Sequence, residues 1–153
     1  DAADFGLSGQ ETREALDADA ELKARLEAIR LEVGPMMNLG DVTNKSVPKM
    51  TLVSRPLSGG AIATRSFIPH RCHASIGVFA AVSVATACVL PDGPAARLAA
   101  IPADGIFRIE HPTGAAEVAI QRDETGAVSS AGTIRTARKL FDGRVFPGPA
   151  RRE

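Results

Sequence analysis

The sequence predicts an α+β fold in which a mixed sheet surrounds one buried helix. Three observations predict this fold: apolar residues recur at helical spacing in the first third, an apolar run fills residues 74–90, and strand-like segments lie on both sides of that run. The chain has 153 residues, of which 44% are hydrophobic and 24% charged, so it is long enough to bury a substantial core.

The first third is predicted to be helical. Ser8 followed by Glu11 fits a capping box, in which each side chain satisfies a free main-chain N–H. The predicted helix ends at Gly34-Pro35. We therefore divide the chain into an N-terminal helical segment, 1–35, and a second part, 36–153. One apolar stripe follows the helical spacing: Leu22, Leu26, Ile29 and Val33.

The second part begins with a polar loop, 36–45, and continues with two strands, 49–55 and 61–68, that are joined by a turn at 57–60. The apolar run 74–90 is shorter than the about 20 residues needed to span a bilayer, so we interpret it as a buried helix with no solvent-facing side. A short helix and further strands follow, the strands being separated by Gly-containing turns. The predicted short helix covers 94–100, and the strands cover 105–110, 115–121, 128–137 and 144–146.

Composition excludes several classes of function. Eighteen basic residues balance eighteen acidic ones, so no net charge draws the chain toward nucleic acid or a membrane. The only two cysteines, Cys72 and Cys88, are too few for a disulfide scaffold and indicate reduced thiols in a cytoplasmic protein. Because the chain begins without Met, a basic start or an apolar signal segment, we expect a fragment or a processed product.

The segment that leads into the predicted buried helix carries the clearest candidates for chemistry: His70, Arg71, Cys72 and His73. The amino end of a helix favours an anion and lowers the pKa of a nearby thiol, so a carboxylate and an acid/base thiol could share this place. Two other interpretations stay open: an ordinary strand-to-helix junction, or part of a zinc site whose remaining ligands are absent. Cys88 lies deep in the apolar run and is predicted to be a core residue.

Two polar segments could bind a ligand. The turn His111-Pro112-Thr113-Gly114 offers an imidazole and a hydroxyl, although the residues by themselves favour a plain hairpin turn. The loop from Asn38 to Lys45 could bind carboxylates or simply be solvated. Arg135 and Arg138 lie three apart on a predicted strand and therefore face opposite sides, so at most one of them points into a given site.

The run from Arg65 to Val78 and its continuation from Ala81 to Cys88 closely resemble the 4-oxalomesaconate tautomerases of gallate degradation, which are members of the methylaconitate isomerase family. Further stretches agree in the same order along the chain. They are 26–31 leading to 37–42, then 111–114, and finally 135–143.

The resemblance implies a diaminopimelate-epimerase-like fold, in which each of two domains is a barrel-like mixed or antiparallel sheet wrapped around a central helix, with the active site between the domains. Residues 74–89 would be the central helix of the second domain, and 36–153 would be that C-terminal epimerase-like domain. The N-terminal domain of the family is missing, so either another chain supplies it or this is an isolated, inactive fragment.

The resemblance also implies a cofactor-independent isomerase that moves a proton within an unsaturated di- or tricarboxylate, here the keto–enol tautomerisation of 4-oxalomesaconate. Cys72 or His73 would be the acid/base residue, although in relatives from propionate metabolism a Met-His pair resembles Cys72-His73, and Met cannot transfer a proton. The alternatives are a methylaconitate-type allylic isomerase and an inert carboxylate-binding fragment. A homo-oligomer stays open, and no metal is expected. The residues expected to bind substrate are His70, Arg71, Ser75, His111, Thr113 and Asn38.

Overall fold

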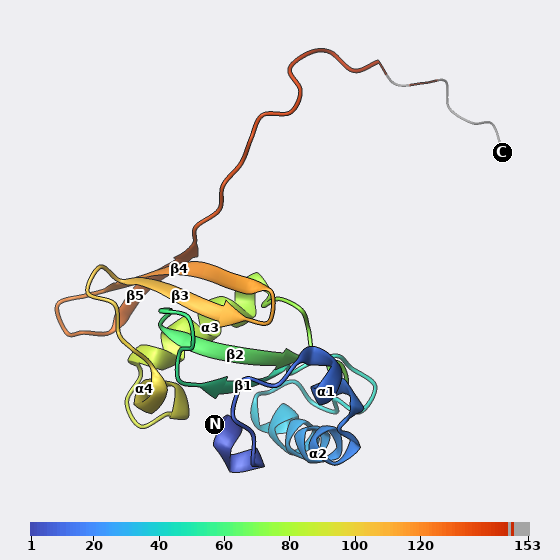
Figure 1. Ribbon diagram of the computed structural model, residues 1–153. Helices are drawn as coiled ribbons and strands as arrows, with labels where there is room; N and C mark the ends of the chain where they lie inside the picture. Colours follow the sequence, from blue (N-terminus) through green and yellow to red (C-terminus); the bar gives the residue numbers. More distant parts are fainter. Residues whose placement is uncertain (147, 149–153) are drawn as a thin grey trace.

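The computed structural model describes residues 1–146 and 148, and its centre is an open five-stranded sheet with helices on both faces (Figure 1). The strand order is β1-β2-β3-β4-β5, with β1 and β5 at the two edges in the described part of the chain. Only the β2–β3 pair is parallel; the other three pairs are antiparallel. The mixed sheet of an α+β fold is therefore confirmed. The strands are β1 (Met50–Ser54), β2 (Ile62–Phe67), β3 (Ile106–His111), β4 (Gly114–Arg122) and β5 (Val128–Thr133).

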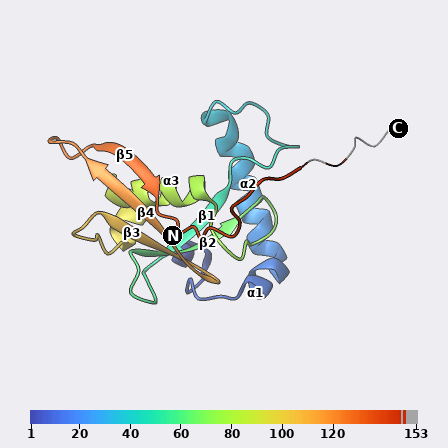
Figure 2. The same cartoon turned by 90° about the horizontal axis from the view of Figure 1, so that it is seen from above.

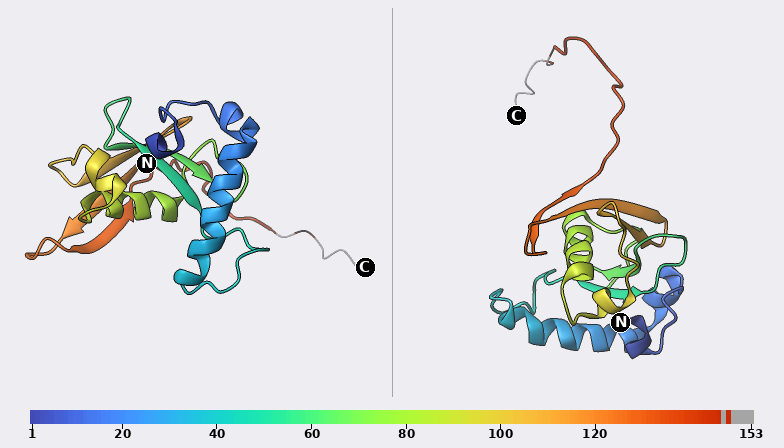
Figure 3. Two further views of the ribbon diagram at one scale, coloured as in Figure 1. Left: turned by 90° about the horizontal axis from the view of Figure 1, so that it is seen from below. Right: turned by 90° about the vertical axis from the view of Figure 1, so that its left-hand side faces the viewer.

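The N-terminal helices pack on one face of β1 and β2, as Figure 3 shows. They are a 3₁₀ turn, η1 (Ala2–Phe5), and two α-helices, α1 (Arg13–Ala18) and α2 (Ala20–Met36). Asp19 divides the helix that the sequence predicts, because its carboxylate accepts a hydrogen bond from the N–H of Leu22 at 2.8 Å and starts a new helix. Ser8 and Glu11 are hydrogen-bonded at 2.7 Å as expected, but Thr12 is the residue that caps α1.

The buried stripe of α2 differs from the prediction. It repeats every fourth residue and consists of Leu22, Leu26, Arg30 and Gly34. The predicted end at Gly34-Pro35 is wrong, since the helix continues to Met36. Gly34 serves packing instead: a Cβ on this residue would lie 2.5 Å from Cγ2 of Val42, so only glycine lets the following loop approach the helix.

Two helices cover the opposite face of the sheet: α3 (Val78–Val89) and α4 (Pro94–Leu98). Figure 2 shows α3 running alongside the strands. The predicted start of the buried helix at residue 74 is wrong, because Gly77 is the N-cap of α3. The carbonyl oxygen of Ala74, which a helical N–H would otherwise use, accepts hydrogen bonds from Thr113. Cys88 lies in the core beneath α3, as predicted.

The burial of α3 is one-sided. Ala81, Val84, Ala85 and Cys88 face the sheet, whereas Phe79 is 87% exposed. The prediction of a helix enclosed on every side is therefore wrong for this chain, because one sheet covers only one face of a helix. No helix among the described residues is long and apolar enough to cross a membrane.

The chain leaves the sheet after β5. The strand predicted to reach residue 137 ends at Thr133, and the strand predicted at 144–146 is not formed. Residues 134–146 run away from the sheet and are exposed, as Figures 1 and 3 show. Ile134 still donates its main-chain N–H to the carbonyl oxygen of Glu117 on β4, but residues 135–146 form no main-chain hydrogen bond to a strand, so their strand pattern is not realised.

Candidate active site

Two of the segments that the sequence singles out meet in the structure. The hydroxyl of Thr113 donates to the carbonyl oxygen of Ala74 at 2.8 Å, and the main-chain N–H of Thr113 donates to the same oxygen at 3.2 Å. The turn between β3 and β4 is thereby held against the connection between β2 and α3. His73 and Ser75 flank Ala74, so the structure brings them close to His111 and Thr113.

Cys72 does not lie at the amino end of a helix. It is 3% exposed, pairs with Phe67 in an isolated bridge, and donates its main-chain N–H to the Asp17 carboxylate at 2.6 Å. Burial, with a further contribution from the negative charge of Asp17, raises the pKa of the thiol to about 11. The expected lowering of this pKa is therefore wrong. At neutral pH the Cys72 thiol keeps its proton.

His73 has a different environment from Cys72. Its main-chain N–H donates to the carbonyl oxygen of Ser66 at 2.8 Å, which fixes the backbone, while the residue itself is exposed. Ser75 is exposed as well. Of the two residues expected to move a proton, His73 is the one that a molecule in solution can reach.

His111 lies half-buried at the end of β3, with Nδ1 3.4 Å from the Thr113 hydroxyl. Burial lowers the pKa of this imidazole, and the positive charge of Arg65 lowers it further, whereas hydrogen bonding to the Ala74 main chain acts in the opposite direction. The lowered pKa favours the neutral imidazole, which has one donor and one acceptor nitrogen.

His70, Arg71 and Asn38 lie outside this group. The His70 side chain is 60% exposed, and its Nδ1 is 3.7 Å from a carboxylate oxygen of Glu27 on α2. Arg71 is exposed. Asn38 is also exposed, has a φ of 59°, and follows the end of α2. Within the described residues no hydrogen bond or ion pair joins Asn38 to His73 or His111.

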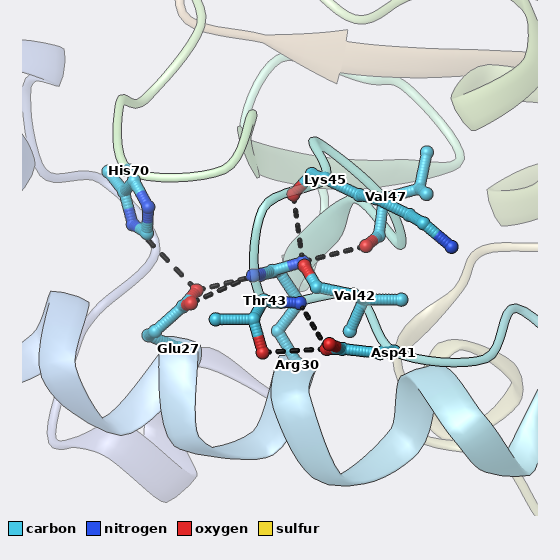
Figure 4. Close-up of polar contacts among 8 residues, drawn as sticks. All are labelled: Glu27, Arg30, Asp41, Val42, Thr43, Lys45, Val47 and His70. Carbon is cyan, nitrogen blue, oxygen red and sulfur yellow. Dashed lines mark hydrogen bonds and ion pairs between the residues drawn. The ribbon is translucent and has the colours of Figure 1, made fainter.

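The loop after α2 is held by a buried arginine that sequence reasoning missed (Figure 4). Arg30 is 1% exposed and forms two hydrogen bonds with Glu27, at 2.7 and 2.8 Å. Its Nη1 also donates to three main-chain carbonyl oxygens, those of Val42, Lys45 and Val47. The i+4 spacing from Leu22 and Leu26 was the signal that could have identified Arg30 as a buried residue.

A second buried charge fixes the turn between β1 and β2. The Glu110 carboxylate accepts main-chain hydrogen bonds from Leu57, Ser58 and Gly60 at 2.7, 2.8 and 2.7 Å. Burial by itself raises the pKa of this carboxyl, but the three N–H donors outweigh burial, so the net result is a lowered pKa. A Cβ at Gly60 would lie 2.6 Å from Cγ of Glu110, so residue 60 has to be glycine.

Three cavities are lined by residues of these segments and of their neighbours. The first, of about 370 Å³, lies at the amino end of α3 and is lined by Ile76, Val78, Arg108 and Arg135. The second, of about 260 Å³, is lined by Arg65, Arg108, Glu110 and His111. The third, of about 360 Å³, is lined by residues 10–14, Arg65, Ala74 and Thr113. Cys72 lines none of them, and Arg135 rather than Arg138 points into the first.

Two of the cavities suit a small anion. The first is lined by Arg108 and Arg135 against Glu117, and the second by Arg65 and Arg108 against Glu110, whereas the third carries two arginines and two glutamates. The amino end of α3 also leaves main-chain N–H groups without a side-chain cap. Among the described residues no group of three or more His, Cys, Asp or Glu side chains is placed to hold a metal ion. The arrangement can orient carboxylates and offers His73 and His111 for proton exchange.

Comparison with known proteins gives consistent results. The model of the PrpF protein family matches residues 1–147. A (4E)-oxalomesaconate Delta-isomerase of Novosphingobium sp. (strain KA1) is 60% identical over 147 residues, which are 95% of this chain and 41% of that protein. A 4-oxalomesaconate tautomerase of Pseudomonas putida is 55% identical over 149 residues, which are 96% of this chain and 41% of that protein. The chain thus spans about two fifths of the length of these relatives.

The fold has a counterpart among solved structures. The crystal structure of a methylitaconate-delta-isomerase superimposes with a TM-score of 0.76 at 21% identity, over 88% of this chain and 41% of that chain. At this level of identity the similarity concerns the fold. It agrees with the mixed sheet and helices described above.

Proposed function

The chain belongs to the PrpF protein family, and on that premise we propose that it forms part of an isomerase that acts on oxalomesaconate. The observation that carries the proposal is the identity of 60% and 55% to two proteins named for that substrate, over nearly all of this chain. The two names give different isomerisations of the same anion. Of these we propose the keto–enol tautomerisation of 4-oxalomesaconate.

The proposed reaction moves one proton. A C–H bond next to the conjugated system breaks, an O–H bond forms at the ketone oxygen, and no electrons leave the substrate. Such a reaction needs a base, an acid and groups that hold the carboxylates. It needs no redox cofactor, and we propose that the enzyme uses none.

We assign proton transfer from this chain to His73. It is exposed and adjoins Ala74, which lines the third cavity, and an imidazole has ring nitrogens that can accept and donate a proton. Cys72 is the second candidate, but a thiol with a pKa of about 11 is protonated at neutral pH and acts only as a proton donor. The buried position of Cys72 makes it the weaker candidate of the two.

We propose that the carboxylates are held around the amino end of α3. Ser75 and the uncapped N–H groups that follow it would bind one carboxylate, in the cavity that Arg108 and Arg135 also line. His111 and Thr113 would contact the substrate from the neighbouring turn. His70, Arg71 and Asn38 would contact it only when the rest of the cleft is in place, because they lie outside these cavities.

The remaining three fifths of a protein as long as the relatives would form the other side of the cleft. We propose a diaminopimelate-epimerase-like enzyme in which residues 1–35 form a helical segment and residues 36–153 form the C-terminal domain. An N-terminal domain of the same enzyme would form the opposite wall of the cleft. The exposed face of α3 around Phe79 supports a partner on that side. A cytoplasmic place in gallate degradation follows from the proposed substrate.

An ultraviolet assay of enol formation tests the proposal, using this chain with and without the N-terminal half of the Pseudomonas putida relative. Turnover of oxalomesaconate only in the combined sample supports a two-domain tautomerase. Turnover of methylaconitate but not oxalomesaconate would replace it with an allylic isomerase. Carboxylate binding without turnover in either sample would leave a binding module.

The same assay tests the residue assignments. His73→Ala and Cys72→Ser should each lower turnover by at least about tenfold if they transfer protons. Cys88→Ser is the matched control for the thiol, because Cys88 is also buried and its pKa is also raised to about 11, yet it lies in the core under α3. Wild-type rates for His73→Ala and Cys72→Ser would remove both from the site.

A further inference from the structure

The described part of the chain buries two arginines, and only one of them has a counter-ion. Arg30, 1% exposed, forms a two-point ion pair with Glu27. Arg65 is 9% exposed, and no carboxylate lies within 4.0 Å of its guanidinium among residues 1–146 and 148. A buried charge without an opposite charge is costly, so the environment of Arg65 calls for an explanation.

The contacts of Arg65 hold the guanidinium in place without neutralising it. Its Nε donates to the carbonyl oxygen of Glu11, and its Nη1 donates to the carbonyl oxygen of Thr64, each at 2.9 Å. A guanidinium has five N–H donors in a planar fork. These two hydrogen bonds therefore fix its plane, and Nη2 donates to no protein atom in the described part of the chain.

Arg65 borders two cavities, one on each side of the turn at 111–114. The cavity of about 360 Å³ carries two arginines and two glutamates, Arg13, Arg65, Glu11 and Glu14. The cavity of about 260 Å³ carries Arg65 and Arg108 against one glutamate, Glu110. Two arginines against the single carboxylate of Glu110, which stays ionised because its pKa is lowered, leave the smaller cavity with one net positive charge.

The position of Arg108 strengthens this assignment. β2 and β3 are parallel neighbours, with Ala63 opposite Glu110, so Arg65 and Arg108 rise from the same face of the sheet, away from the core beneath α3. His111 borders the same cavity, and its pKa is lowered in part by Arg65. About 30 Å³ is one water molecule's share of liquid volume, so the cavity has room for a carboxylate and part of its carbon skeleton.

We propose that Arg65 is a carboxylate-binding residue, which with Arg108 holds one carboxylate of a small di- or tricarboxylate in the cavity of about 260 Å³ beside His111. This inference rests on the proposed function insofar as that ligand is the substrate. It adds a residue that neither the sequence patterns nor the turn residues indicated. The planar fork of arginine matches a carboxylate in two parallel hydrogen bonds, which lysine cannot form.

The test is a titration of the chain with tricarballylate, a saturated tricarboxylate that cannot tautomerise, followed by ¹H–¹⁵N NMR at constant ionic strength. We expect saturable shifts at residues 57–65 and 108–115 and a rise in the pKa of His111 on binding, because the ligand offsets the charge of Arg65. Arg65→Gln should weaken the affinity for tricarballylate at least about tenfold. The affinity of Arg65→Lys should lie between those of the wild type and Arg65→Gln. Arg122→Gln, an exposed arginine at the end of β4 outside these cavities, should bind as the wild type does.

Several outcomes would overturn the proposal: no saturable binding to the wild type, a folded Arg65→Gln variant that binds within twofold of it, or shifts confined to α2. If Arg65→Gln fails to fold, the binding affinities of Arg65→Lys and Arg108→Gln test the proposal instead. Arg108→Gln should fold, because Arg108 is exposed. The enol assay separates this result from the proposed function. Arg65-dependent binding without turnover keeps the site and rejects the tautomerase, whereas turnover with an unchanged KM in Arg65→Lys rejects the site alone.

Discussion

Thr113 donates both its hydroxyl and its main-chain N–H to the carbonyl oxygen of Ala74, a residue 39 positions earlier in the chain. This contact delays the start of α3 and brings the turn at 111–114 to the segment that carries His73. Two segments that the sequence singled out separately are thus joined through a single carbonyl oxygen.

Thr113→Val tests that contact. The variant keeps the shape of the side chain and the main-chain hydrogen bond but loses the hydroxyl donor, so we expect the free energy of unfolding to fall by about 1 kcal/mol in urea denaturation. Thr125→Val is the control, since the Thr125 hydroxyl bonds only within an exposed turn, to Asp123. An equal loss in both variants would contradict a particular role for the Ala74 contact.

Glu27→Gln tests the anchor of the 42–47 loop. The substitution leaves the Arg30 guanidinium buried without its counter-charge, so we expect the free energy of unfolding to fall by roughly 3 kcal/mol. This value is the lower end of the range for breaking a buried ion pair, because Glu27 is partly exposed. Glu21→Gln, on an exposed position of the same helix, should change stability little. Thermal or urea unfolding of the two variants measures the difference, and similar values would show that the ion pair contributes nothing.

Gly34→Ala should destabilise the protein although alanine is the better helix former. Replacing glycine by alanine inside a helix usually stabilises it by about 1 kcal/mol. Here, however, the new Cβ would lie 2.5 Å from Cγ2 of Val42. A second substitution, Val42→Ala, removes both Cγ atoms and leaves only the Cβ of residue 42, at 3.2 Å from the new Cβ, so Gly34→Ala should be clearly less destabilising in the Val42→Ala background. A double-mutant cycle by urea denaturation measures the coupling. Simple additivity of the two changes would contradict the packing explanation.

The raised pKa of Cys72 makes stability depend on pH. The folded-state pKa is about 11 against an ordinary 9.0, so the folded state holds this proton more tightly than the unfolded chain. The resulting stabilisation is complete below pH 9 and is lost as the pH rises from 9 toward 11. Cys88 contributes in the same direction.

Native Cys72 should accordingly react with iodoacetamide at pH 8 at least about tenfold more slowly than in urea, because the thiolate is the nucleophile and burial blocks access. Mass spectrometry of the labelled peptides distinguishes Cys72 from Cys88. Rapid labelling of native Cys72 at neutral pH would contradict the raised pKa. It would also make this thiol as strong a candidate for proton transfer as His73.

Local patterns predicted much of the fold. The strands from 49 to 68, the short helix after Gly93 and the β3–β4 hairpin follow from residue alternation and turn residues, which act over a few positions. The start of α3 could not be predicted in this way, because Thr113 determines it from a distant part of the chain. The exposure of Phe79 depends on which other elements are present to cover the helix.

The candidate site was predictable in the same uneven manner. The residue types around 73 and 111 indicated acid/base and hydrogen-bonding roles, and the structure places the two segments together. Arg30 and Arg65 are unremarkable in sequence, since arginine is normally exposed. The burial of Arg30 arises from the loop 42–47 folding over α2, and that of Arg65 from residue 11 lying against β2, which no local pattern encodes.

The hydrogen bonds between Glu110 and the turn at 57–60 also limit how this protein can diverge. Gly60 has to remain without a side chain while Glu110 is present, and Glu110 needs the N–H of residue 60. A Cβ at residue 60 would also lie 2.7 Å from the main-chain oxygen of Arg108, so residue 60 has to stay glycine even where Glu110 is replaced. Orthologues should therefore keep Gly60 more strictly than Glu110.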